Sequence, residues 1–164
     1  MVKRITYGGI LTALALIFSY IEILLPLNFG IPGIKLGLAN MVILVGLYFL
    51  NRKDVCIISL LRIIISGLLF GSGMSLIFSL AGGILSLAVM IIIKKSGIFS
   101  IYGVSVSGAV THNIGQILAA LIVMKTRVVL FYLPILMIAG VVTGFVMGLI
   151  ASKLIHIKFL RQII

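Results

Sequence analysis

The sequence GAVTHNIGQ, residues 108–116, lies inside an apolar segment of about residues 98–124 that is long enough to cross a bilayer. On a helix, Gly108, His112, Gln116 and Ala120 are four residues apart and share one face. Polar side chains inside a membrane are costly and are usually retained for a task. This stripe must face protein or water rather than lipid, so we expect it to carry function.

Composition indicates an integral membrane protein. Of the 164 residues, 63% are apolar and only 9% are charged, whereas soluble domains carry about 25% charged residues. A formal charge of +11 would suggest nucleic acid in a soluble protein, but here it indicates basic cytoplasmic loops, and we expect no nucleic-acid partner. The lone Cys56 excludes an internal disulfide and a cysteine metal site.

Six apolar segments predict an all-α protein with six transmembrane helices in a single domain, residues 1–164. The predicted spans are about residues 5–25, 36–50, 55–70, 74–93, 98–124 and 128–152. The first lacks a cleavage site and is expected to be retained. The second and third are short, so they form either two spans or a hairpin of tilted or incomplete helices. Residues 26–35 contain two prolines and predict a lid on the outer side.

The distribution of positive charge predicts the orientation. We predict a protein of the cell membrane with both termini in the cytoplasm. In this orientation nine basic residues are cytoplasmic and three are external, which fits the positive-inside rule. The cytoplasmic set is Lys3, Arg4, Arg52, Lys53, Lys94, Lys95, Lys153, Lys158 and Arg161, and the external set is Lys35, Lys125 and Arg127.

The few polar residues in or beside the spans gather in the predicted outer half and suggest a cavity open to that side. The candidate substrate-binding residues are Glu22, Lys35, Asn40, Arg62, His112, Asn113 and Gln116. Each also has a structural explanation: an ion pair for Glu22, helix packing for His112, or an interhelical hydrogen bond for Asn40 and Asn113. More cations than anions in the set favour an anionic or polar-headed ligand.

Small residues at helical spacing predict close helix packing in the fourth and sixth spans, as at Gly140, Gly144 and Gly148. In the first span, Gly9 and Ala13 either pack within the chain or dock a membrane partner. The chain lacks the clustered aspartates of a prenyl-diphosphate synthase, a phosphate loop for ATP and three convergent zinc ligands. We therefore expect no catalytic residues, no metal site and no cofactor.

The string Pro32–Asn40, PGIKLGLAN, together with residues 108–116 and with Glu22 followed by Pro26, resembles the bacterial Gx transporter family. That family is often called heptaprenyl diphosphate synthase component I and is similar to the S components of energy-coupling-factor transporters. The resemblance implies a six-helix substrate-binding subunit with an outward-facing site. It also implies docking through Gly9 and Ala13 onto a coupling membrane subunit that works with ATPases. The alternative function is that of an accessory membrane subunit of a prenyl-diphosphate synthase.

Overall fold

The structure, a computed structural model, describes residues 2–24 and 38–156, with side chains of the first helix described from Thr6 onward. Every regular element in these ranges is a helix. The elements are α1 (Val2–Leu24), α2 (Asn40–Phe49), α3 (Arg52–Phe70), α4 (Gly73–Ser96), α5 (Ile101–Met124), a 3-10 helix η1 (Arg127–Tyr132) and α6 (Leu133–His156). The all-helical prediction is confirmed, whereas the predicted lid lies outside the described residues.

Four helical segments are long and apolar enough to cross a membrane: those of α1, α4, α5 and η1 with α6. The described helix α2 has 10 residues, which is about 15 Å at 1.5 Å per residue and half of the hydrocarbon core. Helix α3 has 19 residues, but its first turn carries Arg52, Lys53 and Asp54. The second and third predicted segments thus form a short helix followed by a longer one, as in the incomplete-hairpin alternative.

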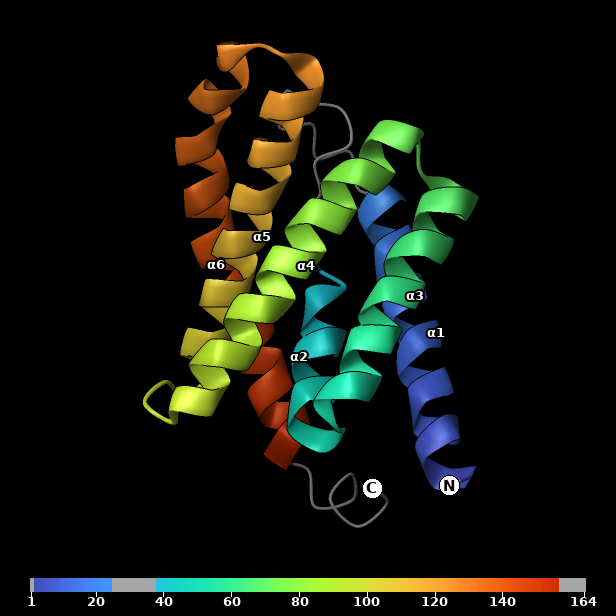
Figure 1. Cartoon of the computed structure of the whole chain (residues 1–164). Coiled ribbons are helices and arrows are strands. Elements are labelled where there is room, and N and C mark those ends of the chain that lie inside the picture. Colours follow the sequence, from blue (N-terminus) through green and yellow to red (C-terminus); the bar gives the residue numbers. More distant parts are fainter. Residues whose placement is uncertain (1, 25–37, 157–164) are drawn as a thin grey trace.

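Successive helices run in opposite directions, so the start of α1 and the end of α6 lie at the same end of the bundle (Figure 1). The turn between α2 and α3 and the end of α4 lie at this end too. It carries Arg52, Lys53, Lys94, Lys95 and Lys153, and we call it the basic end. The opposite end holds Lys125, which follows α5, and Arg127, the first residue of η1. The structure thus separates the basic residues as the sequence predicts.

Glycines bring α4, α5 and α6 into close contact. A Cβ built on Gly82 of α4 would lie 2.7 Å from the carbonyl oxygen of His112 in α5. A Cβ on Gly144 would lie 2.8 Å from the Cα of Val106 in α5. Both distances are shorter than side chains tolerate, so the glycines allow the backbones to approach. The predicted packing role of small residues in the fourth and sixth spans is confirmed.

Helix α1 lies at the side of the bundle and contacts α3 and α2 (Figure 1). Its outward face carries exposed apolar residues, among them Ile10, Leu14 and Ile17. Gly9 and Ala13 are also exposed, and a Cβ built on Gly9 would meet nothing within 4 Å. Gly9 therefore packs against no residue that the structure describes, and both small residues are accessible on this helix.

Candidate functional site

The polar stripe of α5 faces α4 and the interior of the bundle. His112 is 3% exposed and Gln116 is fully buried. Both border Gly82 of α4, because a Cβ built there would lie 3.0 Å from His112 Nδ1 and 2.9 Å from Gln116 Cγ. One turn away, Ser86 Oγ donates a 2.7 Å hydrogen bond to the carbonyl oxygen of Gly108. The expectation that this stripe faces protein rather than lipid is confirmed.

Asn113 points in a different direction from its neighbour His112 and contacts α6. Its Nδ2 donates a 2.6 Å hydrogen bond to the carbonyl oxygen of Leu136. A Cβ on Gly140 would lie 2.9 Å from the same Nδ2, so the amide fits a notch left by that glycine. This contact supports the structural explanation for Asn113, although its Oδ1 is buried without a partner among the described residues.

Arg62, Asn40 and Glu22 connect three helices. The Arg62 guanidinium donates a 2.5 Å hydrogen bond from Nη2 to Asn40 Oδ1, which links α3 to the first turn of α2. The charge of Glu22 in α1 acts on the same guanidinium. All three side chains are at most 9% exposed. Arg62 is thus the cation on which the charge of Glu22 acts, as one of the two predicted pairings requires, while Lys35 lies outside the described residues.

Two neighbouring glycines of α4 show that Arg62 and His112 lie at a similar depth in the bundle. Gly82 borders His112 of α5, and Gly83 borders Ile63 of α3, whose Cδ1 would lie 2.5 Å from a Cβ built on that glycine. Arg62 precedes Ile63 in the chain. The candidate residues that the structure describes are all buried, and we call them together the polar layer: Glu22, Asn40, Arg62, His112, Asn113 and Gln116.

Several polar atoms in this layer have no hydrogen-bond partner among the described residues. Both amide atoms of Gln116 are buried and unpartnered, as are Asn40 Nδ2 and Arg62 Nε. Ser79 of α4, which the sequence did not single out as a site residue, adds a buried Oγ in the same condition. An unpaired buried polar atom costs about 1–3 kcal/mol, so the fold has retained groups that are suited to a polar partner.

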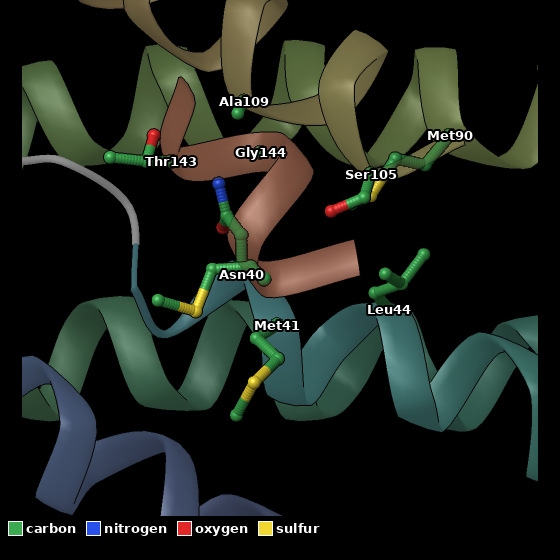
Figure 2. A pocket seen from close by; sticks show the side chains of 9 residues that line it. Asn40, Met41, Leu44, Met90, Ser105, Ala109, Thr143 and Gly144 are labelled. Carbon is green, nitrogen blue, oxygen red and sulfur yellow. The ribbon is translucent and has the colours of Figure 1, made fainter. Parts of the chain in front are cut away.

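A small cavity lies next to the polar layer, between α2, α4, α5 and α6 (Figure 2). Its free volume is about 10 Å³, which is roughly the room that one water molecule needs. Asn40 and Ser105 supply polar atoms, and Met41, Leu44 and Met90 supply most of the apolar wall. Ser105 belongs to the α5 face that the sequence stripe defines, but no sequence signal marks the contribution of Thr143 from α6.

The described residues contain no group of three or more histidines, cysteines or acids that is able to hold a metal ion. The two acidic residues are far apart in the fold, since Asp54 lies in the first turn of α3 at the basic end and Glu22 lies near the opposite end of α1. Within these residues the polar layer offers hydrogen-bond donors and acceptors together with one guanidinium. Such an arrangement is suited to binding a small polar molecule.

Comparison with known families identifies the chain. The family model described as heptaprenyl diphosphate synthase component I matches residues 11–154. The chain belongs to this family. The match runs from the first half of α1 nearly to the end of α6, so it includes the whole polar layer. No curated protein and no solved structure matches the chain. The likeness to S components of energy-coupling-factor transporters remains a prediction.

Proposed function

We propose that this member of the heptaprenyl diphosphate synthase component I family is a membrane subunit that binds a small, anionic or polar-headed molecule for uptake. The ligand site is the polar layer. In this proposal the chain carries out no chemistry on the ligand, because binding requires only the hydrogen-bonding groups and the charge that the layer supplies.

The observation that carries the proposal is the buried side-chain amide of Gln116. Its amide has two donors and an acceptor, is fully buried, and has no partner among the described residues. A glutamine retained only for packing would be replaced at a gain by an apolar residue of similar size. A ligand with a polar head would pair with this amide and with Arg62 Nε, which also has no partner among the described residues and lies at a similar depth in the bundle.

The charge around the layer supports an anionic or polar ligand. Arg62 is a fixed cation, and Asn40 opens α2, so the partial positive charge at this helix start lies next to the guanidinium. Glu22 offsets part of the charge of Arg62. An anionic group would neutralise the remainder, whereas Glu22 is the one acidic group that the described part of the layer offers a cation.

The placement in the membrane follows from charge and length. Four segments are able to span a bilayer, and the positive-inside rule assigns the basic end to the cytoplasm, so we propose a cell-membrane protein with both termini inside. The accessible face of α1, with Gly9 and Ala13, is the surface that we propose for docking a coupling membrane subunit, which in turn would be driven by ATPases.

The family name supports a second candidate, an accessory membrane subunit of a heptaprenyl diphosphate synthase. In that case a separate, aspartate-rich subunit would supply the catalytic site. An uptake assay and a synthase turnover assay together distinguish the two functions. Uptake by membranes that contain the chain, an energy-coupling subunit and ATPases would support transport. A rise in synthase turnover when the purified chain is added would instead support the accessory role.

Native mass spectrometry of gently extracted protein tests the binding function directly, because a co-purifying small molecule would name the ligand. The proposed orientation is tested by cysteine accessibility in a Cys56→Ser background. Lys95→Cys at the basic end should be labelled only from the cytoplasmic side, and Lys125→Cys at the opposite end only from outside. Labelling of both from one side would contradict the placement.

A further inference from the structure

A second set of positive charges lines a pocket at the basic end, far from the polar layer. This pocket has a free volume of about 70 Å³ and is lined by Leu47, Arg52, Ile91, Lys94 and Lys95. Its cations come from the start of α3 and the last turn of α4. Three basic side chains around one small pocket provide a concentrated positive charge.

The structure holds one of these cations firmly in place. The Lys94 ammonium donates a hydrogen bond to the carbonyl oxygen of Leu47 near the end of α2, and it lies 4.5 Å from the centre of the Tyr48 ring. Arg52 lines the same pocket, and its charge repels that of Lys94. Asp54 is the acidic residue in the adjoining turn of α3, but it does not line the pocket. An anion would relieve this repulsion.

An apolar groove continues from the pocket along the outside of the bundle. It runs between α3 and α4, has a free volume of about 270 Å³, and shares Ile91 with the basic pocket. Cys56, Leu60 and Ile63 line one wall, and Ile84 and Ala88 line the other. From Arg52 to Ile63 the helix rises by about 17 Å at 1.5 Å per residue, which is close to the hydrocarbon thickness of one leaflet, about 15 Å.

We propose that this pocket and groove together bind one anionic phospholipid of the cytoplasmic leaflet. The phosphate-bearing headgroup lies among Arg52, Lys94 and Lys95, and one acyl chain lies in the groove between α3 and α4. The continuity at Ile91 favours a lipid over a soluble anion, because a soluble anion has no use for the groove. The inference rests on the membrane placement proposed above but not on the ligand of the polar layer.

Lipid titrations followed by native mass spectrometry test the headgroup site. Phosphatidylglycerol should bind more tightly than phosphatidylcholine with the same acyl chains. Arg52→Gln and Lys95→Gln should each weaken phosphatidylglycerol binding about fivefold, the effect expected of one basic residue near an anionic lipid surface, and leave phosphatidylcholine binding unchanged. Lys153→Gln is the control, because Lys153 is exposed at the same end and does not line the pocket.

The chain site is tested by filling the groove. Ala88 is exposed in the groove wall, so Ala88→Phe should weaken phosphatidylglycerol binding, whereas Val142→Phe on the exposed face of α6 should not. Equal binding of the two lipids would overturn the inference. So would full competition by inorganic phosphate together with no effect of Ala88→Phe, which would indicate a soluble anion.

The same spectra separate this inference from the proposed function. If Arg52→Gln and Lys95→Gln leave lipid binding unchanged while a small molecule still co-purifies with the protein, the lipid site is wrong and the polar layer keeps its role. If Gln116→Leu leaves the co-purifying molecule bound while the lipid titrations behave as expected, the lipid site is supported and the polar layer is wrong.

Discussion

Replacing Arg62 by methionine should destabilise the protein by about 3–5 kcal/mol, the range found when one partner of a buried ion pair is removed. Arg62 is 6% exposed, and it donates a 2.5 Å hydrogen bond to Asn40 while interacting with the charge of Glu22. The lost hydrogen bond from a charged donor accounts for about 1.5–3 kcal/mol. The remainder arises because the buried Glu22 carboxylate loses its countercharge.

The assay is the free energy of unfolding in detergent micelles, measured by denaturant titration. Arg52→Met is the matched control, because Arg52 opens the same helix and is exposed, so its loss should change stability by no more than about 0.5 kcal/mol. A double variant, Arg62→Met with Glu22→Gln, should recover part of the loss because it also removes the uncompensated carboxylate. Equal stability of the Arg62→Met and Arg52→Met variants would refute the buried pair.

Two further predictions concern the packing of α5. Gly115→Ala should lower the free energy of unfolding by about 1–3 kcal/mol, because its Cβ would lie 2.8 Å from backbone atoms of Ala81 and Gly82. Gly9→Ala, in open space, should be neutral or slightly stabilising when the two variants are compared by thermal unfolding. Asn113→Leu should cost about 1 kcal/mol through the lost hydrogen bond to the Leu136 carbonyl. Equal melting temperatures for the two glycine variants, or an unchanged one for Asn113→Leu, would contradict the α5 contacts described above.

The apolar segments were enough to predict an all-helical fold and its long helices. The apolar segments gave the long helices to within a few residues, because a continuous apolar run has a single low-energy backbone in a membrane. The last segment was predicted as one helix over about 128–152, but it begins with a 3-10 helix, and α6 starts at Leu133. Pro134 fits at the start of α6, where its missing N–H breaks no helical hydrogen bond.

The candidate site was predictable in part. A period of four placed His112 and Gln116 on one face, and the rotation of Asn113 predicted its contact with a neighbouring helix. Which neighbours these side chains meet could not be predicted, because periodicity defines a face without naming the partner. Gly82 becomes relevant only in the fold, where it borders both His112 and Gln116.

That contact also limits what a His112 variant can test. In the structure the His112 ring fills space against Gly82 and is 3% exposed, so His112→Ala would leave a cavity and lower stability as well. A change in binding by His112→Ala would therefore not distinguish a ligand-binding role from a packing role. A variant of Gln116 distinguishes these two roles.

The most direct test of the proposed site is native mass spectrometry of the Gln116→Leu variant, with the melting temperature measured on the same preparation. Both atoms of the Gln116 amide lack partners among the described residues, so leucine should leave the melting temperature unchanged or raise it. The fraction of protein that carries the co-purifying small molecule should fall at least tenfold. A variant that keeps the small molecule but melts at a lower temperature would show that Gln116 is structural and would contradict the assignment of the polar layer as the ligand site.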